Sequence, residues 1–309
     1  MNVLVVGGNG FIGSHVLDAL LETAAEISVL DVCPERYRSP LARVHYFQGS
    51  FGDMAAVELA LKHKPDVVIH LAHYGLSLNA TGLPESDLRN LDDSVRLFES
   101  CIKHGVGKII FASTGGKIYG LTGRVAVSES HPTNPLGSYA IIKLALEKFL
   151  MSLSHYSGIE TVILRPSNPY GIRQSPLGAQ GVIPIVAWRM LHRQPITVWG
   201  DGDAVRDYIG VKDIARFCSI AATQRCSGIF NLGSGVGVST AEVIALLAEI
   251  LQVEPMIERA PARKSDVPWI VLDSTRAKEE LDWRPPANFS AGLVEVVDWL
   301  RQLDINATG

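Results

Sequence analysis

A tyrosine and a lysine four positions apart are the pair in this sequence best suited to proton transfer. Tyr139 and Lys143 form a Y-x-x-x-K pattern, and residues four apart lie on the same face of a helix. The phenol and the ammonium can therefore point into one site. A free tyrosine has a pKa of about 10, and a nearby cation stabilises the phenolate and lowers that pKa. We predict that Tyr139 is a general acid/base and that Lys143 assists it.

Two hydroxyl residues, Ser113 and Thr114, directly follow an apolar run at residues 108–112. If that run is a parallel strand, its carboxyl end lies at the edge where open α/β sheets bind ligands. We therefore predict that one of these hydroxyls faces the substrate. The residue types do not say which of the two it is.

A glycine-rich segment, GGNGFIG at residues 7–13, follows the apolar run at residues 3–6. Its spacing is G-x-x-G-x-x-G, with Gly7, Gly10 and Gly13 at the fixed positions. Such glycines allow a tight turn, a close approach of the backbone to a pyrophosphate, and close packing of helix on strand. Because the segment lies between an apolar run and an amphipathic stretch, it predicts a dinucleotide site at the start of a helix.

An acid at the end of the next apolar run indicates which dinucleotide is bound. Asp31 lies about 20 residues beyond the glycines, where a carboxylate binds the adenosine ribose hydroxyls. A carboxylate repels a 2′-phosphate, so the sequence favours NAD over NADP. Arg36 and Arg38 are near enough in sequence to leave NADP open.

Strands alternating with helices must position these groups. Short apolar runs stand at residues 3–6, 27–30, 44–47, 67–71, 108–112 and 161–164, and amphipathic stretches at 14–23, 54–62 and 91–104 lie between them. This alternation predicts an α/β fold with a Rossmann-type doubly wound parallel sheet. Glycine and proline become frequent after Pro166. We predict a Rossmann domain at 1–167, to which 206–234 returns, and a smaller C-terminal α/β substrate lobe at 168–205 and 235–309.

The composition narrows the class of protein. Apolar residues make up 47% of the 309 positions, which excludes a disordered chain, and the net charge of −4 comes without a basic stripe. Neither nucleic acid nor an anionic membrane is therefore an expected partner. No apolar run reaches the roughly 18 residues of a membrane span, and no basic leader precedes the first strand. The four cysteines form no C-x-x-C pair, so we expect reduced thiols, no metal site and a cytoplasmic location.

Taken together, these motifs resemble those of the extended short-chain dehydrogenase/reductases, the NAD-dependent epimerase/dehydratase family, and most closely its UDP-hexose 4-epimerases. The resemblance covers almost the whole chain. The further matching segments are FASTGGKIYG at 111–120, SYAIIK at 138–143, LRPSNPYG at 164–171, WGDGDAVRDYIGVKDIA at 199–215, FNLGSG at 230–235 and RKSD at 263–266.

The resemblance implies a role for individual residues. Thr114, Tyr139 and Lys143 would be catalytic. NAD would be bound by Gly7, Gly10, Phe11, Ile12, Gly13, Asp31, Ser50, Phe51, Leu71, Ala72, Asn90 and Ser113, together with Tyr139 and Lys143. The nucleotide sugar would be bound by Ser113, Thr114, Asn168, Arg206, Arg263, Asp266 and Ile270. Three places depart from the pattern: Ser50-Phe51 replaces an acid and an aliphatic residue near the adenine, His73 replaces an alanine, and Gly210 replaces a histidine.

The resemblance also implies which reaction follows formation of a 4-keto sugar. Dehydratases carry Asp-Glu after the catalytic threonine, whereas this chain carries Gly115-Gly116, two glycines that leave room for the sugar to rotate. This favours 4-epimerisation of a UDP-hexose or UDP-N-acetylhexosamine. A uronic acid stays open because Lys117 and Arg173 can pair with a carboxylate.

The alternatives are a 4,6-dehydratase or 4-keto reductase of the same family and a non-catalytic, dinucleotide-sensing regulator. The family further implies a homodimer formed by helices at 91–104 and 139–156. An apolar stripe on the first of these helices, formed by Val95, Phe98 and Ile102, fits either that interface or the core.

Overall fold

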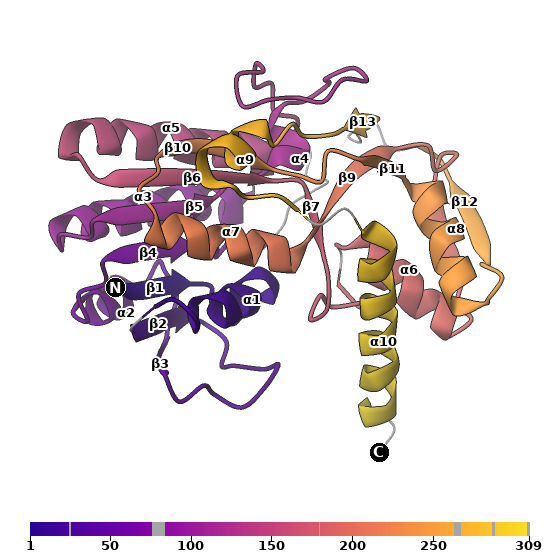
Figure 1. The fold of residues 1–309 in the computed structure, drawn as a ribbon, viewed down its shortest axis with the longest axis horizontal. Coiled ribbons are helices and arrows are strands. Elements are labelled where there is room, and N and C mark those ends of the chain that lie inside the picture. Colours follow the sequence, from indigo (N-terminus) through magenta and orange to yellow (C-terminus); the bar gives the residue numbers. More distant parts are fainter. Residues whose placement is uncertain (25, 76–83, 179, 263–266, 286–287, 308–309) are drawn as a thin grey trace.

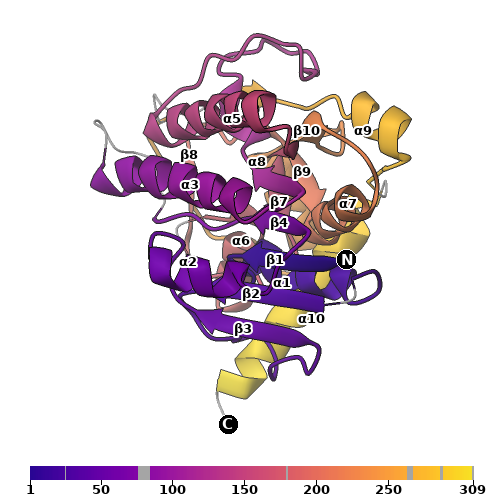
Figure 2. The same cartoon turned by 90° about the vertical axis from the view of Figure 1, so that its left-hand side faces the viewer.

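A seven-stranded parallel sheet forms the centre of the larger of two bodies in the protein (Figures 1 and 2). The computed structural model describes residues 1–24, 26–75, 84–178, 180–262, 267–285 and 288–307. The strand order is β10-β6-β5-β4-β1-β2-β3. The strands are β1 (Asn2–Val6), β2 (Glu26–Asp31), β3 (Val44–Gln48), β4 (Val67–His70), β5 (Lys108–Ala112), β6 (Glu160–Pro166) and β10 (Gly228–Leu232). Each of the six apolar runs in the sequence is one of these strands, so the predicted Rossmann-type sheet is confirmed.

The sheet is apolar on both sides because helices cover both of its faces. Along β1, Val3 and Val5 point into one core, which lies under α1 (Phe11–Leu20) and α7 (Val211–Thr223). Leu4 and Val6 point into the opposite core, under α2, α3 and α5. Those helices span Met54–Leu61, Glu85–Lys103 and Ser138–Ser157. A strand buried on both faces needs apolar residues at consecutive positions, which explains the unbroken runs.

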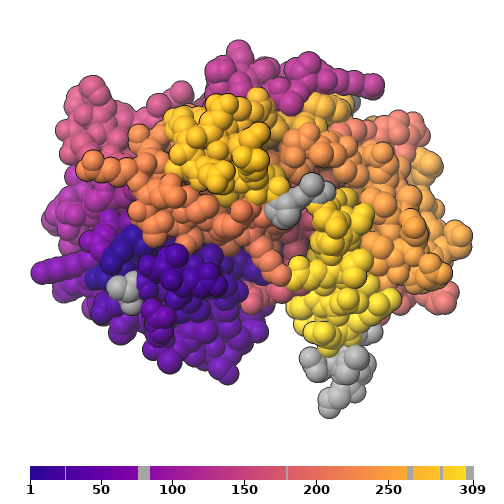
Figure 3. Space-filling model, in the orientation of Figure 1, coloured from indigo at the N-terminus to yellow at the C-terminus, as the bar shows by residue number. Residues whose placement is uncertain are grey.

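Most of the chain after Pro166, apart from α7 and β10, forms a smaller body on the right of Figure 1. One sheet contains β7 (Asn168–Tyr170), β9 (Val205–Gly210), β11 (Gly237–Ser239) and β13 (Trp269–Ile270). A two-stranded sheet joins β8 (Ile196–Trp199) to β12 (Ile257–Ala260). The helices α6 (Val182–Leu191), α8 (Thr240–Leu251) and α10 (Phe289–Ala307) pack around a third apolar core. Figure 3 shows α10, in yellow, as a separate ridge on the surface.

The chain passes between the two bodies several times. Within residues 206–234, α7 packs beside α1 and β10 pairs with β6, whereas β9 belongs to the second sheet. The short helix α9 (Thr275–Leu281), late in the sequence, lies beside β10 (Figure 1). The division into an NAD-binding domain and a substrate lobe stays a prediction.

Two helices begin earlier than the periodicity indicates. α1 begins at Phe11, directly after Gly10, and α3 begins at Glu85 after Pro84. The first turn of α3 is polar, and that of α1 belongs to the glycine motif, so neither turn continues the apolar periodicity of the helix that follows.

The cysteines and the helices agree with other expectations from composition. All four cysteines are free, and Cys101 and Cys218 are fully buried. Within the described ranges, no helix has both the length and the apolar character needed to cross a bilayer.

Candidate active site

The glycine-rich turn between β1 and α1 has the geometry of a phosphate cradle. Gly7 adopts a φ of +86°, and a Cβ on Gly13 would lie 2.1 Å from the Gly7 carbonyl oxygen. Glycine is therefore required at both positions. Gly10 is the N-cap of α1 and supplies no side-chain hydrogen bond, and the described first turn carries no acid. The first N–H groups of α1 are thus available to an anion, beside Phe11 and Ile12, so the turn fits a dinucleotide pyrophosphate.

Asp31 lies at the end of β2, beside this turn. Its carboxylate accepts hydrogen bonds from the backbone N–H of Asn9 (2.9 Å) and of Cys33 (3.0 Å). These contacts fix the carboxylate where the sequence places a ribose acceptor. Arg38, which left NADP open, is bound to Asp18 and to the Ser14 carbonyl oxygen (3.1 Å). Its guanidinium is therefore held along α1.

The loop after β4 packs against the glycine turn. The backbone N–H groups of Leu71 and Ala72 both donate to the Val6 carbonyl oxygen, at 2.9 and 3.1 Å. A Cβ on Gly7 would lie 2.8 Å from the Ala72 nitrogen. The two residues assigned to NAD therefore contribute backbone that shapes the edge of the cradle.

Ser50, Phe51 and Asn90 are held by a common neighbour, Tyr74. The Ser50 hydroxyl is hydrogen-bonded to the Tyr74 hydroxyl. The buried Phe51 ring stacks on the Tyr74 ring, with 4.3 Å between the ring centroids. Asn90 accepts from the Tyr74 N–H at 2.8 Å and donates to the carbonyl oxygens of Tyr74 (2.9 Å) and Ser86 (2.8 Å). These contacts give Asn90 a structural task, and its predicted contact with NAD stays a prediction.

Thr114, Tyr139 and Lys143 come together at the carboxyl end of β5. Tyr139 and Lys143 lie on one face of α5, and the side chain of Thr114 lies close enough to Tyr139 to interact with its phenol. The Lys143 ammonium donates to the Ala112 carbonyl oxygen at 2.7 Å. Ser113 instead donates its hydroxyl hydrogen to Glu147 at 2.5 Å. The structure thus distinguishes the two hydroxyls: Thr114 lies beside the tyrosine and Ser113 points to the buried acid.

Burial dominates the protonation behaviour of this cluster. It raises the pKa of Tyr139 to about 12, while the interaction with Thr114 lowers it and the negative charge of Asp87 raises it further. Burial also lowers the pKa of Lys143 to about 7, against the raising effect of Glu147. The pKa of Tyr139 is therefore raised, and not lowered as the sequence predicts. The cost of removing the phenolate from water is the largest cause of this shift.

A buried polar network that the sequence analysis missed lies beneath this cluster. Glu147 receives two hydrogen bonds from Arg165, at 3.0 and 2.6 Å, in addition to the one from Ser113. Arg165 also donates to the Tyr119 hydroxyl at 2.9 Å, and that hydroxyl donates to Asn231 at 2.6 Å. The signal was present in the sequence, because Glu147 follows Lys143 by four residues and shares its helical face.

Packing requires glycine at residue 115 and leaves little space at residue 116. A Cβ on Gly115 would lie 2.4 Å from Cδ1 of Leu272 and 2.7 Å from the Arg165 carbonyl oxygen. A Cβ on Gly116 would lie 2.9 Å from Oδ1 of Asn168. The short helix α4 (Gly115–Ile118) therefore rests directly on the chain between β6 and β7. This contact places the predicted diphosphate ligand Asn168 next to the turn that carries Thr114.

The remaining predicted substrate residues lie on β9, on β13 and beyond. Arg206 and Ile270 are paired in register between these two strands. Arg206 donates to the Val205 carbonyl oxygen at 2.9 Å, and Ile270 is buried. Arg263 and Asp266 lie outside the described residues. Arg173, weighed as a partner for a uronic acid, forms an ion pair with Asp18 at 2.7 Å.

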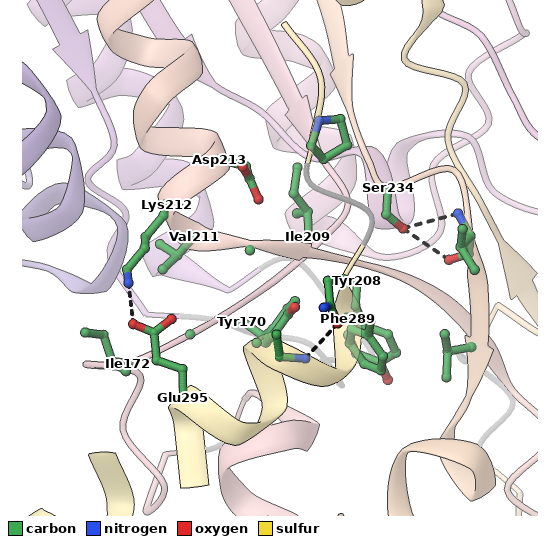
Figure 4. Close-up of a pocket in the computed structure, with 18 residues that line it drawn as sticks. Tyr170, Ile172, Tyr208, Ile209, Val211, Lys212, Asp213, Ser234, Phe289 and Glu295 are labelled. Atoms are coloured by element: carbon green, nitrogen blue, oxygen red, sulfur yellow. Dashed lines mark hydrogen bonds and ion pairs between the residues drawn. The ribbon is translucent and has the colours of Figure 1, made fainter. Parts of the chain in front are cut away.

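Two cavities flank β9. One, of about 410 Å³, lies where β7 and β9 meet the start of α7 and α10, and Tyr170, Tyr208 and Phe289 line it (Figure 4). The catalytic cluster does not contribute to its described lining, so this cavity is separate. The other, of about 610 Å³, lies beside Trp199 and Trp269, next to the predicted substrate residues of β9 and β13.

Known proteins share both the sequence and the shape of this chain. Residues 3–233 match the model of the NAD dependent epimerase/dehydratase family. A UDP-glucose 4-epimerase of Mycolicibacterium smegmatis is 30% identical over 309 residues, covering 97% of this chain and 99% of that protein. The structure of a Thermotoga maritima UDP-glucose 4-epimerase with UDP-glucose is 35% identical, with a TM-score of 0.91 and coverage of 98% and 99%. The structure of a Thermus thermophilus UDP-glucose 4-epimerase in complex with NAD is also 35% identical, with a TM-score of 0.91, and the match covers 97% of this chain and 99% of that one.

Proposed function

Because this chain belongs to the NAD-dependent epimerase/dehydratase family, we propose that it inverts C4 of a nucleotide sugar, with UDP as the favoured nucleotide. The observation that carries the proposal is the contact between Thr114 and Tyr139 beside Lys143, at the edge of a sheet whose glycine turn fits NAD. The relatives with UDP-glucose and with NAD support both ligands.

The residues of the cluster divide the proton chemistry between them. Tyr139 removes the proton from the sugar O4 hydroxyl and later returns one to the same oxygen, while Thr114 holds that oxygen by a hydrogen bond. Tyr139 must be a phenolate to accept this proton, and Lys143, fixed by the Ala112 carbonyl oxygen, supplies a positive charge that stabilises that phenolate. When bound, NAD would accept a hydride from C4 and give it back to the opposite face of the 4-keto sugar.

The nucleotide is assigned to the second body of the molecule. Asn168 and Arg206 can hold a diphosphate, since guanidinium and amide groups donate to its oxygens. The cavity beside Trp199 is lined by Val205, the neighbour of Arg206 in sequence, and offers aromatic surface to a base. Arg263 and Asp266 complete the proposed set, and Ile270 is proposed to limit the size of the sugar 2-substituent.

The residues after Thr114 favour an epimerase over a dehydratase. A 4,6-dehydratase needs an acid and a base near C5 and C6, and the chain continues with two glycines there. A 4-keto reductase would consume an external reductant, which the proposed reaction does not. A dinucleotide-sensing regulator would have no need for a buried tyrosine beside a lysine.

The decisive experiment incubates the NAD-loaded protein with UDP-glucose, UDP-N-acetylglucosamine or UDP-glucuronate, without added reductant, and follows the products by NMR. We expect the C4 epimer, reached from either side of the equilibrium. A 4-keto-6-deoxy product would establish a dehydratase instead. Turnover that appears only with added NAD(P)H would establish a reductase.

We also propose that the protein is a homodimer joined through α3 and α5. The predicted stripe does not serve this purpose, because Phe98 is 0% exposed and Val95 and Ile102 pack on the core. Other apolar side chains of these helices remain exposed: Ile141 at 50% and Phe149 at 48%. They are eight residues apart, about two helical turns, so they share one face of α5.

Charge on that face should separate the subunits. Ile141→Lys combined with Phe149→Lys is expected to give a monomer by analytical ultracentrifugation. Leu59→Lys, on an exposed position of α2, is the matched control and should leave the mass unchanged. A dimer that survives both substitutions on α5 would place the interface elsewhere.

A further inference from the structure

Three buried acceptor atoms near Tyr139 receive no hydrogen bond from the described residues. They are both carboxylate oxygens of Asp87 and Nε2 of His73. Asp87 is 0% exposed. A buried carboxylate without donors is costly, and buried polar atoms in folded proteins are nearly always paired. The catalytic scheme above uses neither residue, so these atoms need another explanation.

Both residues lie next to Asn90. Asp87 lies one turn before Asn90 on α3, so both point to the inner side of that helix, where both are buried. The Asn90 amide nitrogen lies 3.3 Å from Nδ1 of His73 and binds the main chain of Tyr74. The His73 ring in turn meets the Tyr139 ring edge-on, with 5.0 Å between centroids. Asp87 also acts electrostatically on the Tyr139 phenol, which places its charge at the same site.

The hydrogen bonds of His73 determine its tautomer. Nδ1 lies 2.6 Å from the Gly75 carbonyl oxygen, which can only accept, so Nδ1 carries the proton. Nε2 is then an acceptor. Burial and the charge of Lys143 lower the pKa of His73 to about 3, so the ring is neutral at physiological pH. The three atoms are therefore all acceptors, and a partner must bring donors.

The position of Asp87 in a helix does not account for it. An acid in the first turn is favoured by the helix dipole, and both Glu85 and Asp87 occupy the first turn of α3. Glu85 has the same benefit while exposed to solvent. The helix dipole stabilises negative charge in the first turn, but it supplies no hydrogen-bond donor to a carboxylate that is fully buried.

We propose that Asp87 and His73 accept hydrogen bonds from the hydroxyl groups of a neutral sugar ring bound beside Tyr139. Two rings present such hydroxyls at this site, the hexosyl group of the substrate and the nicotinamide-side ribose of NAD. If the ring is the hexose, the buried carboxylate also selects against a uronic acid, because two desolvated carboxylates repel each other. The inference rests on the proposed function and names the sugar class that fits it.

The test measures binding, so it does not depend on turnover. Isothermal titration of the NAD-loaded protein gives the affinities for UDP, UDP-glucose and UDP-glucuronate, and a separate titration gives the affinity for NAD. Asp87→Asn keeps the shape of the side chain and replaces one acceptor oxygen with a donor. Glu85→Gln is the matched control, since it removes the same charge from the same helical turn at an exposed position.

A hexose partner predicts a specific pattern. The wild-type protein should bind UDP-glucose at least about tenfold more tightly than UDP-glucuronate, the range expected for hydrogen bonds to a charged group. Asp87→Asn should lower the affinity for UDP-glucose by about tenfold and leave the affinity for UDP unchanged. It should also reduce the difference in affinity between UDP-glucose and UDP-glucuronate. A ribose partner predicts instead that Asp87→Asn lowers the affinity for NAD by about tenfold and leaves the ratio of the affinities for the two UDP-sugars unchanged. Glu85→Gln should do neither.

The remaining outcomes decide against the proposal. Unchanged affinities for NAD and for both sugars in a folded Asp87→Asn protein would assign Asp87 a purely structural role. If Asp87→Asn does not fold, by circular dichroism, His73→Gln provides the same readouts from the second acceptor, and unchanged affinities there overturn the inference. Failure of the wild-type protein to epimerise any sugar would overturn the proposed function alone, because the binding pattern is measured separately.

Discussion

Arg165 and Glu147 form a two-pronged ion pair in which the side chains are 2% and 0% exposed. Its two hydrogen bonds measure 3.0 and 2.6 Å, and Glu147 also accepts from Ser113 and acts electrostatically on Lys143. Taking two charges out of water is unfavourable, so the pair persists because each group has its partner and further hydrogen bonds. It connects β6 to α5 under the catalytic residues.

Breaking this pair from one side should be strongly destabilising. Arg165→Met leaves the Glu147 carboxylate buried without its cation, and we expect a loss of about 3–5 kcal/mol in the free energy of unfolding. Urea denaturation measures it. The matched control is Arg301→Met, which breaks the exposed pair with Asp298 and should cost less than about 1 kcal/mol. Equal losses in the two variants would mean that burial does not set the energy of the pair.

Removing the phenol should abolish turnover while leaving the fold in place. Tyr139→Phe is expected to lower kcat by roughly 10²–10⁴-fold, the usual contribution of a general acid/base. NAD affinity and the melting temperature serve as checks on folding. Tyr156→Phe, on the same helix at 84% exposure, should retain full activity. A Tyr139→Phe enzyme that keeps its kcat would assign the proton transfer to another group.

The buried lysine should make stability depend on pH. The pKa of Lys143 is lowered by burial to about 7, whereas in the unfolded chain it is about 10.4. Between these values the unfolded state binds more protons, so the free energy of unfolding rises with pH through this window and the penalty is fully present below it. Before NAD and substrate bind, Tyr139, with a pKa of about 12, stays neutral throughout this window.

Comparison with Lys143→Met isolates this effect. The melting temperature of the wild-type protein should rise relative to that of the variant between pH 7 and 10, measured by scanning calorimetry. A difference that stays constant across this range would show that Lys143 keeps an ordinary pKa in the folded protein.

A methyl group at residue 115 should disturb both stability and catalysis. Gly115→Ala places a Cβ 2.7 Å from the Arg165 carbonyl oxygen, so α4 must move away from β6, at a cost of about 1–3 kcal/mol. Because Thr114 directly precedes this helix, kcat should fall as well. Gly107→Ala, whose Cβ would have an ordinary 3.4 Å contact, is the control and should change stability by less than about 0.5 kcal/mol. Equal behaviour of the two variants would restore the interpretation that Gly115 only leaves room for the sugar.

The sheet could be predicted from sequence because a parallel strand buried on both faces leaves an unbroken apolar run. Five of the six runs are of this kind, and the exception is the edge strand β3, where His45 is exposed. The second body was predicted only from the higher frequency of glycine and proline after Pro166. Its strands are as short as two residues, Trp269–Ile270 in β13, and they pair across long stretches of chain. The periodicity of apolar residues within a segment does not indicate which distant strand that segment pairs with. The position of β9 in the second sheet could therefore not be predicted.

The site shows the same division between local and distant information. Tyr139 and Lys143 share a helical turn and could be paired from their spacing. The partner of Glu147 is Arg165, on the following strand, and Asp87 reaches Tyr139 from another helix. The raised pKa of Tyr139 depends on burial, which a residue pattern does not report. Chemistry that depends on tertiary neighbours therefore became visible only in the folded chain.

The pairing of β10 with β6 sets an order of events during synthesis. The edge of β6 is complete once Pro166 has left the ribosome, but its neighbour at Gly228–Leu232 follows only after most of the second sheet has been made. Until then β6 presents an unpaired edge, the feature through which partly folded chains stick to one another. Slow translation between residues 167 and 227 would therefore prolong the interval in which this protein is most prone to aggregate. A fragment ending at residue 167 would carry that edge permanently.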